Sequence, residues 1–560
     1  MPEAAIVMPR PGNATIRGAA ALWSLPVLFL AIVILYPIFS LFGVLFHDDT
    51  HIVAMLENAR LVRILVNTIK YTVLSTTIAL CIGLPLAWNL SRRDDRTAAA
   101  ARALIALAFV LPEFIYAIAY AFLLEPNTGY LTMLLHRVFP GLTPPLYGLV
   151  GMSIITGLFC VPQIAILVEP ALRNIGAELD EAAETCGAST VAILRRVTLP
   201  LAAPAILTAA LLTFLLAFAS FGIPAALGIP VSYFVLSTEV FSVVSTYPPQ
   251  FGEAAILSII FLAVGLIATG GQIYATRLSN RYRTISGKGF RRRSRTTPAI
   301  ERLAASIYVW FCVLAVSVLP LLMIFAASIS KSWWKMPGPV TLEHYAFVLA
   351  HDPLIVDVAR TTIAVTVITT FGCIALALMV CGFVSGRHGT FAVLVRLLGY
   401  VALSVPPIAF TIGALLAYVK PPLALYGTIW ILVFTYWARF YPLAAGPISD
   451  GFAQLDPALI EAAHISGANT TQTFWRIQLP LMRGVTVAAA LVVTMFTVRE
   501  LLSAVFLQSS QVKMAMVAIF NYWDEGNLER AAAMSGVVLA LCAVIFFAAN
   551  RFQTSAAWHR

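Results

Sequence analysis

The sequence predicts an all-α integral membrane protein built from two tandem copies of a six-span unit. Three observations lead to this prediction: the apolar composition, the spacing of long apolar runs, and a polar pattern that occurs twice. Hydrophobic residues make up 60% of the 560 residues and charged residues only 11%, whereas soluble domains carry about 25% charged residues. This is too little polar surface for a water-soluble globular protein. We therefore expect most of the chain to lie in the lipid bilayer.

Apolar runs long enough to cross a membrane occur throughout the chain. A helix needs about 20 apolar residues to cross the hydrocarbon core. In the first half such runs lie near 21–45, 64–90, 102–124, 147–169, 203–228 and 254–276. In the second half they lie near 304–328, 361–384, 396–418, 426–448, 484–507 and 529–550. The first run is too long for a signal-peptide core, so we expect it to remain as the first of about twelve spans.

The basic residues indicate the orientation of the spans. The chain has a formal net charge of +10, but its Lys and Arg lie mostly in short loops between apolar runs. This distribution is typical of membrane topology and argues against nucleic acid as a partner; membrane lipid is the expected surroundings. With the N-terminus inside, 24 of these residues fall in inner segments and 8 in outer segments. We therefore expect both termini in the cytoplasm.

A polar pattern repeats between the two halves. Its first copy consists of Glu181, Ala182, Ala183, Gly187, Leu199 and Pro200. The second copy lies 280 positions later and consists of Glu461, Ala462, Ala463, Gly467, Leu479 and Pro480. Further upstream the offset is 294, as between Pro112 and Pro406. Because apolar composition alone does not reproduce a polar loop, we divide the chain into a first unit (1–276, loop 181–200), a basic cytoplasmic linker (277–303) and a second unit (304–560, loop 461–480).

Each repeated loop has the pattern of a short helix, a glycine turn, a second helix and a proline that opens the next span. Ser189 and Asn469 are residue types that cap helix N-termini, and glycine permits backbone angles that a side chain forbids. Small alanines would let another protein approach the first helix closely. Two matched loops suit a symmetric pair of soluble subunits.

This pattern resembles the EAA loop of bacterial ABC-importer permeases, and the resemblance covers about 60–276 and 300–550. It implies two type I permease units in the bacterial inner membrane, which move by alternating access. It also implies that the twelve loop residues named above contact two copies of a separate ATP-binding subunit, which binds ATP-Mg. The other implied partner is a periplasmic or extracytoplasmic substrate-binding protein.

The chain itself is not expected to be an enzyme. It has no Gly-x-x-x-x-Gly-Lys-Ser/Thr phosphate loop, and the linker segment 286–289 has the wrong spacing for one. No span carries a plausible nucleophile–base set. The seven cysteines show no paired spacing that suggests a metal site. We therefore expect no catalytic residue, no metal and no cofactor in this chain.

Charged residues inside spans are costly, so each is a candidate for function. We expect Glu113, Arg499 and Glu500 to lie on the translocation path or its outer gate, with ion pairing between helices as the alternative. Arg439 is a fourth candidate for the path, although we favour a structural role for it. Glu113 corresponds to a proline in the other half, so the two halves differ in their charges.

The substrate is the least determined feature. Segments 220–225, 247–252, 287–290 and 499–502 resemble those of ferric-iron importer permeases. Permeases for 2-aminoethylphosphonate or thiamine share the fused layout, and polyamine is a further alternative. A secondary transporter with six plus six spans is the alternative from another class, and it would not need an ATPase.

Overall fold

The computed structural model confirms the all-α class. It describes residues 13–44, 58–175, 179, 182–183, 185–281, 299–335, 338–385, 393–395, 398–399, 401 and 404–558. Every named element in this part of the chain is a helix. One isolated bridge, between Ser330 and Val340, is the only β-type pairing among these residues.

The first half contains long helices separated by short ones. The long helices are α1 (Asn13–Gly43), α3 (Ala59–Ser91), α7 (Gly148–Arg173), α10 (Leu199–Phe218) and α13 (Phe251–Arg281). The shorter helices are α4 (Arg96–Ala108), α5 (Glu113–Leu124), α6 (Tyr130–Val138), α9 (Thr190–Ile193), α11 (Gly222–Leu227) and α12 (Leu236–Ser245). A π-helical turn, Leu194–Thr198, joins α9 to α10.

The second half follows the same order. Its first span consists of α14 (Ala299–Val313), a π turn (Leu314–Val318) and α15 (Leu319–Ile329). The other long helices are α17 (Ile355–Val384), α20 (Ile429–Ala453), α24 (Arg483–Val498) and α27 (Leu528–Trp558). Shorter ones are α16 (Glu343–Ala346), α19 (Pro407–Val419), α21 (Pro457–Ile465), α22 (Thr470–Thr473), α23 (Leu479–Leu481), α25 (Leu502–Leu507) and α26 (Ala515–Asp524).

The number of continuous spans is lower than the twelve expected. Within the described residues, eight helical segments are long and apolar enough to cross a membrane, or up to eleven if each of three bent pairs is one span. The expected span 426–448 is present as α20, but Arg439 and its aromatic residues and prolines lower its mean hydropathy. The expected span 396–418 lies partly outside the described residues, and its described helix, α19, has 13 residues.

One expected span is bent in two, and two others end earlier than expected. The run 102–124 is divided between α4 and α5, which bend by 106° at Pro112. In the runs 203–228 and 484–507, the long helix ends at Phe218 or Val498 and a six-residue helix follows. The span Leu194–Phe218 is present, but the expected C-terminal bounds of both runs were too late because an apolar run does not by itself reveal where a helix ends.

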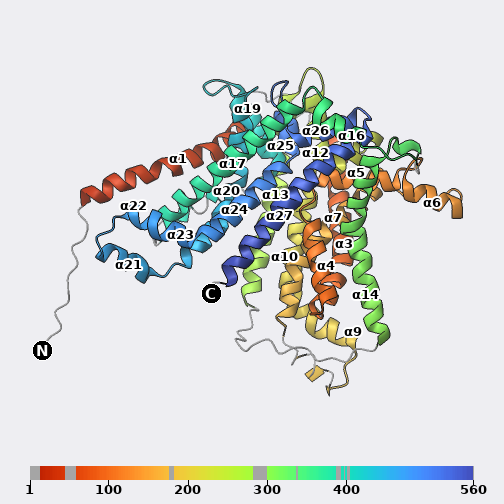
Figure 1. Ribbon diagram of the computed structural model, residues 1–560, viewed down its shortest axis with the longest axis horizontal. Coiled ribbons are helices and arrows are strands. Elements are labelled where there is room, and N and C mark those ends of the chain that lie inside the picture. The colour runs from red at the N-terminus through yellow and green to blue at the C-terminus, as the bar shows by residue number, and fades with distance from the viewer. Residues whose placement is uncertain are drawn as a thin grey trace.

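The two halves exchange their first helices. α1 packs against α19, α17 and α20 of the second half, while α14 and α15 pack against α3, α4 and α5 of the first. Within each half the same trio packs together, α3 with α7 and α10, and α17 with α20 and α24. Figure 1 shows these two bundles converging near α25 and splaying apart toward α9 and α21.

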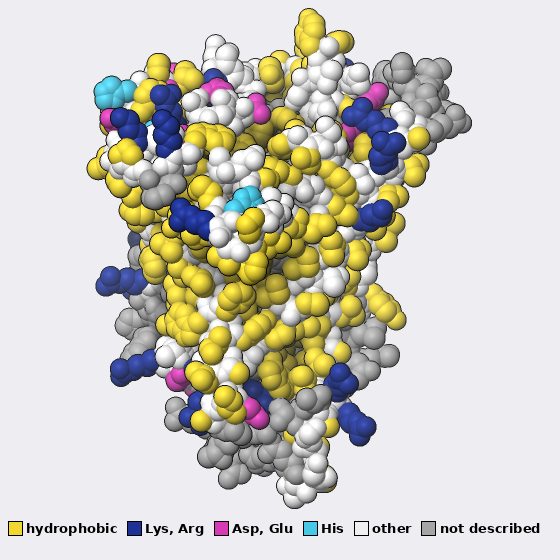
Figure 2. Space-filling view, turned by 90° about the vertical axis from the view of Figure 1, so that its right-hand side faces the viewer, with side chains coloured by type: hydrophobic (Ala, Val, Ile, Leu, Met, Phe, Trp, Pro, Cys, Tyr) yellow, Lys and Arg dark blue, Asp and Glu magenta, His cyan; other side chains and the backbone are white. Residues whose placement is uncertain are grey.

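The outer surface has the distribution of a membrane protein. Large apolar side chains point outward along the long helices, for example Ile363, Val367 and Phe371 on α17. Figure 2 shows apolar side chains across the middle of one face, with most of the charged ones toward its two ends. Such an apolar band is typical of a protein surface in contact with the hydrocarbon core of a bilayer.

Candidate functional site

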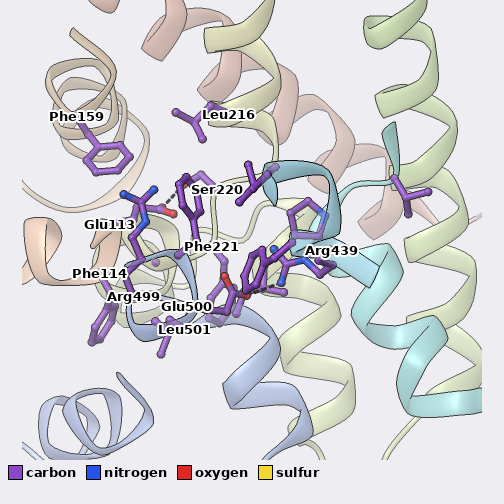
Figure 3. A pocket seen from close by; sticks show the side chains of 18 residues that line it. Glu113, Phe114, Phe159, Leu216, Ser220, Phe221, Arg439, Arg499, Glu500 and Leu501 are labelled. Atoms are coloured by element: carbon purple, nitrogen blue, oxygen red, sulfur yellow. Dashed lines mark hydrogen bonds and ion pairs between the residues drawn. The ribbon is translucent and has the colours of Figure 1, made fainter. Parts of the chain in front are cut away.

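A cavity of about 290 Å³ lies between the two halves. Its walls come from the start of α5, from α7 and α20, and from the breaks that follow α10 and α24 (Figure 3). All four charged residues singled out from the sequence, Glu113, Arg439, Arg499 and Glu500, line this one cavity. Arg439 had been a candidate for the path together with the other three, although a structural role was favoured for it.

The cavity lies on the axis that relates the two halves. Fourteen of its eighteen lining residues form seven pairs at the repeat offsets of 294 and 280. The pairs are Glu113 with Pro407, Phe159 with Arg439, Leu216 with Phe496, Ala219 with Arg499, Ser220 with Glu500, Phe221 with Leu501, and Gly222 with Leu502. A cavity lined by both members of so many pairs must straddle the pseudo-twofold axis. The charges that line the cavity are nevertheless asymmetric, because the repeat equivalent of each charged residue is uncharged.

Glu113 is the first residue of α5, directly after the break at Pro112. One of its carboxylate oxygens accepts a hydrogen bond from the hydroxyl of Ser220 and another, of 2.9 Å, from the backbone N–H of Ile223. Close approach is possible because a Cβ on Gly222 would lie 2.9 Å from the backbone nitrogen of Phe114. Glu113 therefore ties α5 to the start of α11 and has no cation within ion-pair distance among the described residues.

Glu500 binds the start of a six-residue helix in the second half, as Glu113 does in the first. Its carboxylate accepts a 2.9 Å hydrogen bond from the backbone N–H of Ser503 and forms a 2.6 Å ion pair with Arg439. The guanidinium of Arg439 also donates to the hydroxyl of Ser503, which lies 2.7 Å from the hydroxyl of Thr411. Glu500 is thus paired with a residue of another helix, and both partners also line the cavity.

The two carboxylates satisfy equivalent backbone groups from different places in the sequence. Ile223 and Ser503 are repeat equivalents, and each donates its N–H at the start of a six-residue helix. The first N–H groups of a helix lack intrahelical partners and favour a nearby negative charge. In the first half the charge comes from Glu113 on α5, and in the second half from Glu500, two residues before α25. The same electrostatic requirement is thus met twice by unrelated positions.

Arg499 is the cation of the cavity that no carboxylate neutralises by direct contact among the described residues. Its guanidinium donates a 2.9 Å hydrogen bond to the backbone carbonyl of Phe109, at the break between α4 and α5. It also lies 4.4 Å from the ring centre of Phe496, a distance suited to a cation–π contact. Because Phe109 belongs to the first half and Arg499 to the second, this side chain bridges the halves at the cavity.

The sequence analysis missed a line of hydroxyl groups behind Glu113. The hydroxyl of Tyr71 lies 2.9 Å from that of Ser220 and 2.7 Å from that of Thr156. A hydroxyl has one hydrogen to donate. Since Ser220 donates to Glu113, Tyr71 must donate to Ser220 and Thr156 to Tyr71. All of these dipoles therefore point at the carboxylate. The only signal in the sequence was that Ser220 occupies the repeat position of Glu500.

The repeated loops have nearly identical backbone geometry where the structure describes both. Gly187 has φ of +81° and Gly467 has φ of +84°. In each loop the alanine after the glycine donates a 3.0 Å hydrogen bond to the carbonyl of the second alanine of the motif. Both glycines thus end a short helix in the left-handed region, as the pattern predicted. Of the two motif glutamates, Glu181 lies outside the described residues and Glu461 is exposed on α21.

The caps and prolines of the loops also follow the pattern. Asn469 accepts a hydrogen bond from the N–H of Gln472 and forms a capping box with it, and Ser189 accepts from Ala192. Pro200 and Pro480 lie in the first turns of α10 and α23, each directly after a π-helical turn that continues into the helix. Ala182 and Ala462 are exposed, whereas Ala463 is buried.

An ion-pair cluster ties α7 to α4 in the first half. Glu169 on α7 pairs with Arg102 on α4 at 2.6 Å, and Arg102 also donates to the carbonyls of Leu90 and Arg93. In the neighbouring α3–α4 turn, hydrogen bonds from Arg93 and Thr97 hold the pKa of Asp95 well below its usual range. The repeat equivalent of Glu169 is a serine, so the second half lacks this pair.

Comparison with known proteins identifies the family. The model of the binding-protein-dependent transport system inner membrane component matches residues 79–335 and 378–556. The chain belongs to this family. It is therefore an ABC importer permease that carries the family unit twice, as the resemblance of its loops predicted.

Individual relatives agree with this assignment. A ferric transport system permease protein of Actinobacillus pleuropneumoniae is 24% identical over 536 residues, which cover 93% of this chain and 76% of the relative. A second protein named as a ferric transport permease, from Haemophilus influenzae, is 24% identical and covers 82% of this chain and 73% of its own length. A protein named as a 2-aminoethylphosphonate permease, from Salmonella paratyphi A, is 24% identical over 45% of this chain and 94% of its own length.

The described part of this permease contains no cluster of three or more His, Cys, Asp or Glu side chains that could hold a metal ion. The two carboxylates of the cavity are already engaged, Glu113 by hydrogen bonds and Glu500 by Arg439. What the cavity offers a solute is one guanidinium without a carboxylate contact, hydrogen-bonding groups and an aromatic lining. Selectivity for a bare cation does not follow from this lining.

Proposed function

We propose that this permease imports ferric iron across the bacterial inner membrane and takes its energy from ATP bound to two copies of a separate ATPase subunit. The observation that carries the proposal is the likeness to a ferric permease along 93% of the chain, through both fused units. A substrate-binding protein outside the membrane would deliver the metal. Both termini would lie in the cytoplasm.

The two EAA loops are the proposed contacts with the ATPase subunits. Leu459, just before the second loop, and Ile465 and Trp475 within it expose 47%, 74% and 62% of their surface. Exposed apolar side chains that lie beyond the end of a helix bundle indicate a surface for contact with another protein. Leu179, just before the first loop, is exposed in the same way, by 48%. The proposed contact residues remain the twelve motif residues of 181–200 and 461–480.

The proposed transport cycle is alternating access at the axial cavity. In the conformation of Figure 1 the bundles splay toward the loops. ATP binding would bring the two loops together, and the rigid trios α3–α7–α10 and α17–α20–α24 would rock about their converged ends. Arg499, which bridges the halves through Phe109, would have to exchange partners during this movement. Such a device shifts a population of two states by differential contacts.

The substrate can be tested in vesicles that contain this permease, its ATPase and its binding protein. We expect ATP-dependent accumulation of radioactive iron from the iron-loaded binding protein. 2-Aminoethylphosphonate is the second candidate, because a permease named for it matches 94% of its own length to 45% of this chain. Uptake of labelled 2-aminoethylphosphonate with no uptake of iron would reject the ferric assignment and leave the family assignment intact.

A further inference from the structure

The first half carries an insertion on the side of the cavity opposite to the two EAA loops (Figure 1). The repeat offset falls from 294 at Pro112 to 280 at Pro162, so the first half has fourteen more residues between these points. The structure places the difference in one connection. Residues 125–147 join α5 to α7, whereas only 420–428 join α19 to α20. The insertion contains the nine-residue helix α6.

The position of α6 is fixed by the turn that precedes it. The carboxylate of Glu125 accepts hydrogen bonds from the backbone N–H groups of Asn127 and Thr128, at 2.8 and 2.6 Å, and from the Thr128 hydroxyl at 2.7 Å. A Cβ on Gly129 would lie 2.4 Å from the backbone nitrogen of Glu125. The turn is therefore compact, and it directs α6 away from α5 along a defined line.

The helix presents an apolar face that nothing in the described part of the chain covers. Leu131, Leu134 and Val138 follow one another at helical spacing and are exposed by 36%, 42% and 68%. Phe139 and Leu142 continue this face beyond the helix, with 59% and 52% exposed. Thr132, on the opposite side, is fully buried. The helix is thus amphipathic with its apolar side outward, the reverse of a helix in a water-soluble protein.

The surroundings indicate what covers this face. In Figure 1, α6 projects sideways from the bundle, at a level near the converged ends of the long helices. Figure 2 views the molecule from this side and shows the apolar band reaching up to a zone where charged side chains begin. A helix that leaves the bundle sideways at the edge of the apolar band lies where acyl chains meet headgroups. Arg137, at its last turn, is exposed and can reach the headgroup phosphates.

We propose that α6 is an interfacial anchor, whose face of Leu131, Leu134 and Val138 inserts into the outer leaflet at the boundary of acyl chains and headgroups. Short helices with one apolar face and a basic residue bind membranes in this way. The anchor belongs to one half only. It would therefore hold the outer end of the first half against the membrane, while the second half has no corresponding attachment. This inference depends on membrane insertion and not on the identity of the substrate.

A nitroxide label at position 134 tests the proposal in the full chain reconstituted into phospholipid vesicles. The native cysteines are first replaced by alanine, and Leu134→Cys carries the label. Collision rates with oxygen, which concentrates in lipid, and with a water-soluble nickel chelate then report the surroundings. We expect an oxygen-to-nickel ratio severalfold higher than for Glu525→Cys in the exposed α26–α27 turn. It should approach the ratio for Ile363→Cys on the lipid-facing side of α17.

Two results would overturn the anchor. A nickel collision rate as high as at Glu525 would place α6 in water. Low collision rates with both reagents, as expected for the buried control Thr132→Cys, would mean that a protein covers the face. Labelled Thr132→Cys also checks that the helix keeps its orientation, because a label there must remain shielded if α6 is folded as described.

Discussion

The ion pair between Arg439 and Glu500 allows the energetics of the cavity to be tested by a double-mutant cycle. Its nitrogen and oxygen atoms are 2.6 Å apart, and the side chains are only 11% and 14% exposed. At an effective dielectric constant of about 20, the attraction between unit charges at this distance is about 6 kcal/mol. Part of it is offset by the cost of removing both charges from water.

The perturbations are Glu500→Gln, Arg439→Met and the two combined. Removal of one partner from a buried pair costs about 3–5 kcal/mol, because the other charge stays buried without compensation. Since both side chains retain some exposure to the cavity, we expect about 3 kcal/mol for each single variant. The double variant should lose no more than either single one, which gives a coupling energy of about 3 kcal/mol.

The assay is reversible unfolding in mixed detergent micelles, followed by circular dichroism, with Lys420→Met on an exposed loop as the control that should change nothing measurable. Independent sites add within about 0.5 kcal/mol. If the two single losses simply added in the double variant, Arg439 and Glu500 would not be coupled, and the described pairing would be wrong.

Three further changes test other parts of the account. Gly187→Ala and Gly467→Ala place a Cβ at positive φ and should cost about 1–2 kcal/mol locally, which we expect to weaken co-purification of the ATPase. Gly446→Ala, exposed within α20, should instead stabilise the chain by up to about 1 kcal/mol and leave that co-purification unchanged. Glu113→Gln keeps an oxygen acceptor but removes the charge, so ATP-driven uptake should fall at least about tenfold, or about 1.4 kcal/mol, while the melting temperature stays near that of the parent. Equal uptake would remove Glu113 from the path. Asp95→Asn should lower stability by a few tenths of a kcal/mol at pH 7, because the lowered pKa of Asp95 favours the folded state above its unfolded pKa of about 3.9. The difference should disappear as the pH falls through the folded pKa, and a difference that grew in acid would refute this assignment.

Patterns that depend on local chemistry could be predicted from the sequence. The glycine turns are an example: a repeated glycine after a short helix indicates positive φ, and Gly187 and Gly467 adopt +81° and +84°. The all-α class also follows from local physics, since backbone groups in lipid must be satisfied within a helix. The four charges of the cavity could be chosen by their cost in an apolar run.

Features that depend on distant contacts could not be predicted in this way. The run 203–228 looks continuous because no charged residue follows Phe218 within it, whereas in the run 484–507 the charged pair Arg499 and Glu500 directly follows Val498. The start of α11 is stabilised by Glu113, 110 positions away from Ile223, whereas the start of α25 is stabilised locally by Glu500, three residues before Ser503. Only the first of these contacts depends on tertiary structure. Likewise, nothing in the composition of α1 shows that it packs on the second half. The partner of Arg439, 61 positions away, is also set by tertiary structure alone.

The most direct test of the account is the energy source of transport in sealed proteoliposomes with a defined interior. The account predicts substrate uptake only when the permease is reconstituted together with its ATPase, when ATP is on the side of the EAA loops and when the binding protein is on the other side. It also predicts that the double variant Gly187→Ala and Gly467→Ala lowers this uptake while the protein still inserts. Uptake by the permease alone, driven by an imposed ion gradient without ATP, would contradict the account and favour a secondary transporter.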